Sequence, residues 1–268
     1  MTPETILFDA LSAPVVDRVE VPPRPEQRVA FPAGYDQGQI ADWLTAMAGG
    51  SGELWSHQAL ALGHLAAGKN VVVATGTASG KTLIAMAAVI KRILENPTST
   101  FLILVPQKSL LNDQLKRWQA ALERAHLSPS MAAAVDGDTP TDARITAFKT
   151  SPLILATDDI ISAWAMANHP APFISAFARG LTMVVIDEAH ERKGVFGSNS
   201  AYLNRRIAAL QQRCRAAAGL TALQIQWLGL SATILEPAQH LQALTGVPFV
   251  VVDDVRRQHP WHRFEVVI

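Results

Sequence analysis

The stretch VVVATGTASGKTLIAMAAV, residues 71–89, decides the fold of this chain. Four apolar or small residues lead into a turn rich in Thr, Gly and Ser, and Lys81-Thr82 then open a long run of helix-forming residues. A strand, a turn of small residues and a helix in this order direct backbone N–H groups and the positive end of a helix at one point. The pattern therefore predicts a site for a triphosphate.

The turn itself, TGTASGKT at 75–82, matches G-x-x-x-x-G-K-[ST] except at its first position, where Thr75 replaces Gly. We expect Lys81 to reach the β- and γ-phosphates and the Thr82 hydroxyl to bind Mg²⁺. An ordinary Gly/Ser turn between a strand and a helix is the alternative interpretation. The residues expected to hold the phosphates are Thr75, Gly76, Thr77, Ala78, Ser79, Gly80, Lys81 and Thr82.

A second apolar run ends in two acids, in the stretch MVVIDEAHERKGVFG that begins at Met183. Adjacent carboxylates repel each other, so a cation or a reacting water is expected beside Asp187 and Glu188. We expect Asp187 to hold Mg²⁺ and Glu188 to polarise the attacking water. Solvated acids in a strand-end turn are the alternative, which the phosphate loop earlier in the chain disfavours.

The composition predicts a chain that folds around a sizeable core. Of 268 residues, 49% are hydrophobic and 17% are charged, and the formal net charge is zero. Zero net charge does not indicate a nucleic-acid binder by itself, although a basic stripe on one face stays possible. Cys214 is the only cysteine, which excludes a disulfide framework and fits a reducing compartment. With neither a signal peptide nor a membrane span expected, the sequence predicts a cytoplasmic protein, or a nuclear one if the source has a nucleus.

The chain divides into an arm and one α/β domain. Six prolines fall within residues 1–35, which we expect to form an extended N-terminal arm. Residues 36–268 alternate apolar runs with helical stretches, and this predicts a doubly wound, mostly parallel sheet with its ligand at the carboxyl ends of the strands. The expected strands are 71–75, 101–105, 132–136, 153–157, 183–187, 225–231 and 249–253, and the clearest helices are 81–94, 107–125 and 200–217.

With these motifs in place, the sequence resembles the superfamily 2 helicases and translocases. Residues 187–190 read DEAH, one form of the DExD/H box of that family. Three other stretches occur along the chain in the same order as the motifs of that family. LWSHQ (54–58) is similar to the Q motif, which reads adenine. LVPQKSLLNDQ (104–114) is similar to motif Ia, and LSAT (230–233) is similar to motif III. DGDTP (136–140) and GVFGSNSAYLNRR (194–206) are similar to the MrfA-type, Lhr-like helicases of DNA repair.

This resemblance implies a RecA-like P-loop NTPase domain that uses ATP and Mg²⁺. Glu188, Lys81 and His190 are the implied catalytic residues. Gln58 is expected to read N6 and N7 of adenine with its amide, which predicts ATP over GTP, and a surface helix glutamine is the alternative. Motif III, at Ser231, Ala232 and Thr233, would couple the nucleotide to the nucleic acid, with His190 contacting Ser231 and Thr233 or merely packing.

The resemblance also implies a nucleic-acid track at the strand ends, with DNA favoured over RNA. Short polar side chains and loop amides there can bind phosphates of any sequence. One departure from the family pattern, Thr157-Asp158-Asp159, adds a carboxylate where a DNA phosphate is expected. Arg192 and Lys193 are expected to touch DNA or a second domain, or to form a solvated loop. The implied contacts are Pro106, Gln107, Lys108, Ser109, Gly137, Asp138 and Thr157.

The sequence therefore predicts the N-terminal ATP-binding motor lobe of a DNA helicase or translocase. The second RecA-like domain of the family, with its arginine finger, is missing from residues 1–268, so we expect the rest of a longer chain or a partner to supply it. Hydrolysis by this lobe alone is expected to be very slow. The alternatives are a nucleotide-controlled binding module without turnover, and an RNA helicase lobe.

Overall fold

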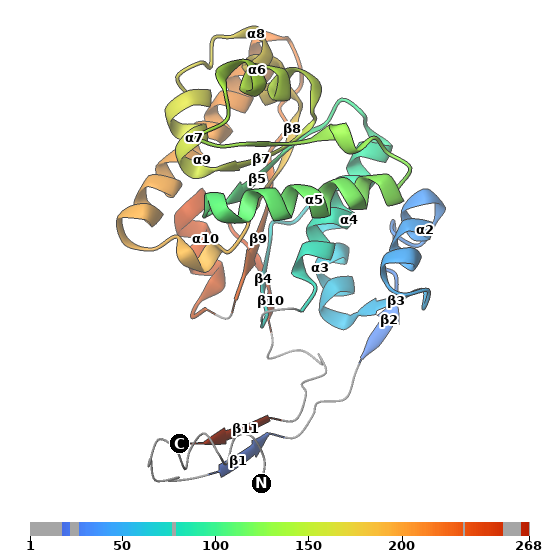
Figure 1. Ribbon diagram of the computed structural model, residues 1–268. Coiled ribbons are helices and arrows are strands. Elements are labelled where there is room, and N and C mark those ends of the chain that lie inside the picture. The colour runs from blue at the N-terminus through green and yellow to red at the C-terminus, as the bar shows by residue number, and fades with distance from the viewer. Residues whose placement is uncertain (1–17, 22–26, 77–78, 233, 254–263, 268) are drawn as a thin grey trace.

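A seven-stranded sheet forms the centre of the computed structural model, which describes residues 18–21, 27–76, 79–232, 234–253 and 264–267 (Figure 1). The sheet order is β10-β4-β9-β8-β5-β7-β6, and every neighbouring pair of strands is parallel. The prediction of a doubly wound parallel sheet is confirmed. Its strands are β4 (Val71–Ala74), β5 (Thr100–Val105), β6 (Ala132–Val135), β7 (Leu153–Thr157), β8 (Leu181–Ile186), β9 (Gln226–Ser231) and β10 (Val250–Asp253).

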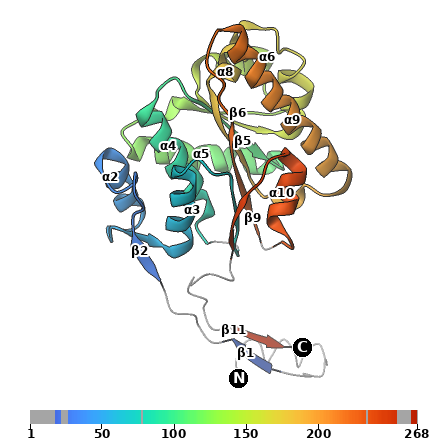
Figure 2. The ribbon, with the colours of Figure 1, turned by 180° about the vertical axis from the view of Figure 1, so that it is seen from behind.

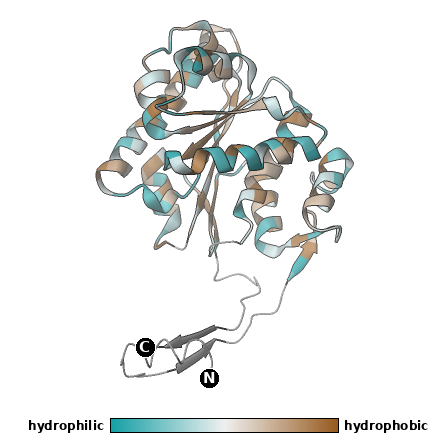
Figure 3. Ribbon diagram, viewed as in Figure 1, coloured by the Kyte–Doolittle hydropathy of each residue, from teal (hydrophilic) through white to brown (hydrophobic). Residues whose placement is uncertain are grey.

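Helices cover both faces of this sheet (Figures 1 and 2). One apolar core contains residues of α2 (Gly38–Met47), α3 (Ser56–Ala66), α4 (Lys81–Glu95) and α5 (Lys108–Arg124). The other contains residues of α6 (Thr141–Thr150), α8 (Pro172–Gly180), α9 (Gly194–Ala217) and α10 (Pro237–Thr245). Along β5, Phe101 and Ile103 belong to the first core, and Leu102 and Leu104 to the second. Hydrophobic strands therefore lie between amphipathic helices, as the hydropathy colouring shows (Figure 3).

The strand order fixes where a ligand can bind. β4 and β5 are consecutive among the strands of the sheet, yet β9 and β8 lie between them. Open α/β sheets bind ligands beyond the carboxyl ends of the strands at such a switch point. The phosphate loop follows β4 and the acidic pair follows β8, so both lie at this edge.

Two strands of the N-terminal region each form a short antiparallel pair with a later strand. β2 (Arg28–Ala30) pairs with β3 (Glu53–Trp55), and β1 (Arg18–Val21) pairs with β11 (Phe264–Val267). Tyr35 is buried in the core, so the last residues of the proposed arm pack on the domain. Residues 1–17 and 22–26 lie outside the described part of the chain, and the division at residue 35 stays a prediction.

α9 begins six residues earlier than the expected start at residue 200. The stretch GVFGSNS is rich in Gly and Ser, residues that usually favour turns. Gly197 is required here because a Cβ atom at this position would lie 2.6 Å from the Arg192 carbonyl oxygen. Gly197 therefore allows the first turn of the helix to lie close to the backbone before it, and does not end the helix.

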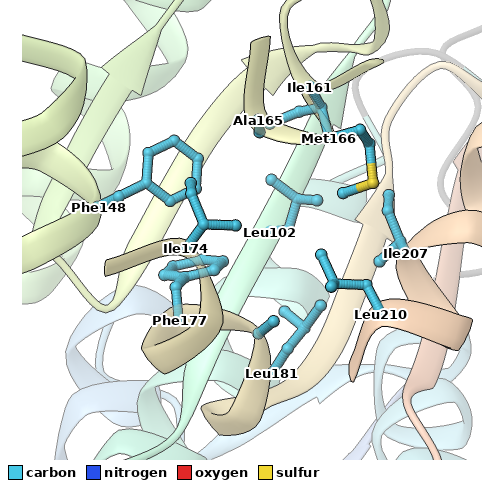
Figure 4. Close-up of a pocket in the computed structure, with 11 residues that line it drawn as sticks. Leu102, Phe148, Ile161, Ala165, Met166, Ile174, Phe177, Leu181, Ile207 and Leu210 are labelled. Carbon is cyan, nitrogen blue, oxygen red and sulfur yellow. The ribbon is translucent and has the colours of Figure 1, made fainter. Parts of the chain in front are cut away.

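The core beside α9 contains a small apolar cavity of about 30 Å³ (Figure 4). Side chains from β5, α6, α8 and α9 line it, together with residues of the short π-helix η2 (Ile161–Ala165). The lining is entirely apolar, so ordered water is not expected inside. Among the described residues, no helix is long and apolar enough to cross a membrane.

Leu102→Ala is expected to lower the free energy of unfolding by about 3–5 kcal/mol, because it enlarges an existing cavity between the sheet and the helices that cover it. Leu102 is 3% exposed and lines the cavity. Chemical denaturation measures the loss. Leu220→Ala is the control, since Leu220 is 48% exposed, and its effect should stay within about 0.5 kcal/mol. Equal effects of the two changes would contradict the packing described here.

Candidate nucleotide-binding site

Lys81 contacts the first residues of its own phosphate loop. Lys81 Nζ donates hydrogen bonds to the carbonyl oxygens of Thr75 and Gly76, at 2.7 and 2.6 Å. Burial lowers the pKa of Lys81, whereas Glu188 and Asp187 act to raise it. Phosphate oxygens can replace the two carbonyls as acceptors. Thr77 and Ala78, also predicted to bind phosphate, lie outside the described residues.

Thr75, the departure from the loop pattern, has a structural role. Its side chain is fully buried, and its hydroxyl lies 2.5 Å from the Ser79 hydroxyl. Its backbone N–H donates to the Ser231 carbonyl oxygen at 3.3 Å, which ties the loop to the end of β9. Thr75 therefore connects the start of the loop both to Ser79 and to the end of β9. Thr82 is half-buried in the first turn of α4.

Two side chains of α3 hold the other end of the loop. The His57 ring Nε2 lies 2.9 Å from the Ser79 carbonyl oxygen, and the Gln58 amide donates to the Gly80 carbonyl oxygen at 3.3 Å. The Gln58 amide oxygen accepts from the Trp55 backbone N–H at 3.2 Å. Gln58 is buried with both ends of its amide engaged, so reading adenine requires these bonds to be exchanged. That role stays a prediction.

The two acids lie in a strained turn after β8. Asp187 Oδ1 accepts from the Glu188 backbone N–H at 3.1 Å, and Oδ2 accepts from the Gln114 side chain at 3.2 Å. Burial, and after it the neighbouring Glu188, raises the pKa of Asp187 to about 6, against the opposing effects of Arg192 and Lys81. Glu188 has a φ of 44°, in the left-handed region that non-glycine residues rarely adopt.

Lys81 and the acidic pair lie at one edge of the sheet, because the phosphate loop follows β4 and the acids follow β8. Lys81 is close enough to Asp187 to oppose the rise in the pKa of that carboxyl. The oxygen donors fit Mg²⁺ brought by a nucleotide, which proteins bind through one or two carboxylates and substrate phosphates. Among the described residues, no group of three or more His, Cys, Asp and Glu side chains forms a metal site by itself. The buried Ser231 hydroxyl at the end of β9 has no hydrogen-bond partner in this structure. It is one more oxygen left for a ligand.

His190 connects the acidic turn with the motif III stretch. Its Nδ1 lies 3.3 Å from Glu188 Oε2, and the Ala232 backbone N–H donates to the same nitrogen at 3.4 Å. The structure thus brings His190 to Ala232, whereas the sequence indicated Ser231 and Thr233. Thr233 lies outside the described residues.

The predicted nucleic-acid contacts follow three neighbouring strands of the sheet. Pro106 to Ser109 follow β5 and begin α5, Gly137 and Asp138 follow β6, and Thr157 ends β7. Lys108 is the cation of this set, and its amine pairs with the Asp138 carboxylate. Both side chains are mostly exposed. The Gln107 amide donates to the Glu191 carboxylate at 3.3 Å. All these residues therefore share the edge of the sheet that carries the phosphate loop.

Residues 55–241 match the model of the DEAD/DEAH box helicase family. This chain belongs to that family. The ATP-dependent helicase HRQ1 of Saccharomyces cerevisiae is 34% identical over 194 residues, which cover 72% of this chain and 17% of that protein. The ATP-dependent helicase YprA of Bacillus subtilis is 31% identical over 240 residues, which cover 90% of this chain and 30% of that protein.

A solved structure agrees with this family assignment. The helicase MrfA, in a crystal structure with DNA, matches the chain with a TM-score of 0.84 at 28% identity, covering 99% of this chain and 36% of that one. The RecA-like fold and the resemblance to MrfA-type helicases are thereby confirmed. This helicase domain spans about a third or less of the length of HRQ1 and YprA.

One prediction about a charged residue of this helicase domain is wrong. Arg192 is 1% exposed, so it neither touches DNA nor lies in a solvated loop. Its partner Asp158 is 5% exposed, whereas Asp159, the other carboxylate of the Thr157-Asp158-Asp159 departure, is exposed. Arg192 and Asp158 are far apart in the sequence, and a charged residue in a loop is usually exposed. The sequence near each residue therefore did not predict that the two would pair.

Gln114 is a residue of the helicase site that the sequence reasoning did not single out. It lies on α5, and its amide donates to Asp187 Oδ2. It is the last residue of the stretch similar to motif Ia, so its position in that motif was the available signal. The helix that begins with Lys108 thus touches the expected Mg²⁺ ligand directly.

Proposed function

We propose that this chain is the ATP-binding motor lobe of a DNA helicase or translocase, which hydrolyses ATP to move on nucleic acid when a second RecA-like lobe is supplied. The main support for this proposal is that Lys81, Asp187 and Glu188 lie at the same edge of the sheet. A nucleotide-controlled binding module without turnover would have no use for a strained Glu188 beside a buried lysine and a histidine.

In this proposal, Lys81 exchanges the carbonyls of Thr75 and Gly76 for β- and γ-phosphate oxygens. Thr82 and Asp187 are the residues that would hold Mg²⁺, which when bound neutralises charge on the phosphates. Glu188 orients the attacking water and accepts its proton. His190, between Glu188 and Ala232, links this event to motif III.

The lobe supplies half of an ATPase site. An arginine finger contributes roughly 10³–10⁵ in rate in related phosphoryl transfers, which is about 4–7 kcal/mol of barrier. We therefore propose that a second lobe provides this group, and that hydrolysis without it is close to background.

The proposed partner is DNA, because MrfA is described as bound to DNA and matches this lobe throughout. The contacts after β5, β6 and β7 bind the phosphate backbone and give no preference of their own between DNA and RNA. The proposal also includes a cytoplasmic location, favoured by the single cysteine, and a role in DNA repair, favoured by the MrfA-type stretches.

The test is ATP hydrolysis by the 268-residue chain, measured with single-stranded DNA, matched RNA or neither, and with a second RecA-like lobe present or absent. We expect near-background rates for the chain alone and stimulation by DNA when the lobe is added. A failure to bind ATP would contradict the proposal. Stimulation by RNA alone would favour the RNA helicase alternative.

Asp138→Asn is expected to strengthen binding to single-stranded DNA about two- to fivefold, because the change frees Lys108 and removes a charge that repels phosphate. The gain is small because exposed ion pairs contribute no more than about 1 kcal/mol. Fluorescence anisotropy with a labelled oligonucleotide measures it, and salt should reduce it. Asp42→Asn, exposed on α2, is the control. If the two variants bind the oligonucleotide with equal affinity, the loops that carry Lys108 and Asp138 do not contact nucleic acid.

A further inference from the structure

Arg192 links the carboxyl ends of three neighbouring strands. Its guanidinium donates to Asp158, directly after β7, through Nη2 at 2.7 Å and Nε at 3.2 Å. The same group donates to the Asp187 carbonyl oxygen after β8 at 2.7 Å, and to the Leu104 carbonyl oxygen in β5 at 3.2 Å. β8, β5 and β7 are adjacent in the sheet. One side chain therefore ties the acidic turn to the strand that ends at Thr157.

This link is rigid. The Arg192 and Asp158 side chains are 0% and 6% exposed, and the Ser200 hydroxyl of α9 donates to Asp158 as well. A bidentate arginine–carboxylate pair fixes both partners in orientation, and burial removes the water that would otherwise compete. We call Arg192, Asp158 and Ser200 the brace.

The hydrogen bond to the Asp187 carbonyl has a specific geometric effect. That oxygen belongs to the peptide plane that joins Asp187 to Glu188, so holding it restricts rotation at the φ angle of Glu188. This is the angle found at 44°, a conformation that persists only where surrounding contacts impose it. The brace therefore helps to aim the Glu188 carboxylate.

We infer that Arg192 and Asp158 are positioning residues that link the nucleic-acid edge at Thr157 to the turn carrying Glu188. The inference rests on the proposed function, since Thr157 is a contact only if nucleic acid binds there. A phosphate that moves Thr157 displaces the adjoining Asp158, and Arg192 passes the displacement to the Asp187–Glu188 peptide. Nucleic acid and nucleotide should then bind cooperatively, and the cooperativity should depend on the brace.

The test compares the affinity of the 268-residue chain for a fluorescent, non-hydrolysable ATP analogue with Mg²⁺, in the presence and absence of a single-stranded oligo(dT). We expect binding about tenfold tighter with the oligonucleotide, within the usual range of coupling between two sites. In Asp158→Asn/Arg192→Gln, this factor should fall below about twofold, while either ligand alone binds within about threefold of the original affinity. Removing both charges together leaves no unpaired ion in the interior.

Two further variants test the coupling factor independently of the double variant. Ser200→Ala removes one hydrogen bond of the brace and leaves the ion pair, so it should lower the factor to about threefold even if the double variant does not fold. Arg215→Gln is the matched control, because Arg215 also donates to two backbone carbonyls, those of Arg179 and Thr221, and should keep the full factor.

Retention of tenfold coupling in a folded double variant, or in Ser200→Ala, would overturn the inference. The original chain binding both ligands without coupling would overturn it too, while leaving the nucleotide site intact. If the original chain binds no nucleotide, the proposed function fails first and the role of the brace fails with it.

Discussion

Lys81→Ala is expected to weaken ATP binding by about 100-fold or more. Hydrogen bonds that involve a charged group contribute about 1.5–3 kcal/mol each, and Lys81 is expected to make such bonds to two phosphates. Two bonds of this strength correspond to a loss of roughly 10²–10⁴ in affinity. In the chain as described, the amine already lies on the loop carbonyls that phosphate oxygens would replace. Titration with a fluorescent ATP analogue measures the effect.

Lys116→Ala is the matched control for this change, since it removes an exposed lysine from α5 and should leave the affinity unaltered. Circular dichroism separates lost binding from lost folding. If Lys81→Ala binds ATP as tightly as the original chain, the loop between β4 and α4 is not the phosphate site.

Glu188→Gln is expected to reduce ATP turnover by about 10²–10⁴-fold, the usual contribution of a general base. Gln has nearly the shape of Glu, so the left-handed turn and the hydrogen bond from the Glu188 backbone N–H to Asp187 should persist. The variant should therefore keep its affinity for ATP while losing the group that accepts a proton from water. The measurement is single-turnover hydrolysis with single-stranded DNA and a second RecA-like lobe, beside a binding titration.

The control for this second change is Glu123→Gln, which alters an exposed acid on α5 and should hydrolyse ATP at the original rate. Normal turnover in Glu188→Gln would exclude Glu188 as the base. If Glu188→Gln loses both ATP binding and ATP turnover, Glu188 contributes to nucleotide binding and is not the base.

Local patterns were sufficient to predict most of this fold. Each strand of the sheet is a short apolar run, and the phosphate loop and acidic pair are contiguous motifs whose neighbours dictate their geometry. The expected strand at residues 153–157 matches β7 at both ends, and the helix expected from Lys81 begins there. Parallel strands bring their carboxyl ends together, so the meeting of Lys81 with Asp187 also followed from the pattern.

Pairings between polar groups distant in the sequence could not be predicted in this way. Nothing near Asp158 or Arg192 in the sequence indicates that each is the other's buried partner. Gln114 reaches Asp187 from a helix whose orientation depends on tertiary packing. The orientation of the Gln58 amide toward Gly80 is a property of the folded loop, whereas the motif alone indicated adenine.

In the proposed function, the strained turn at Glu188 lowers the thermodynamic stability of the lobe in exchange for a correctly placed catalytic carboxylate. A non-glycine residue in the left-handed region costs roughly 1–2 kcal/mol, and the adjacent carboxylate of Asp187 adds repulsion. Glycine adopts the observed φ of 44° without strain. Glu188→Gly should therefore melt at a higher temperature than the native chain while being catalytically dead, and selection for heat resistance alone would erode the active site.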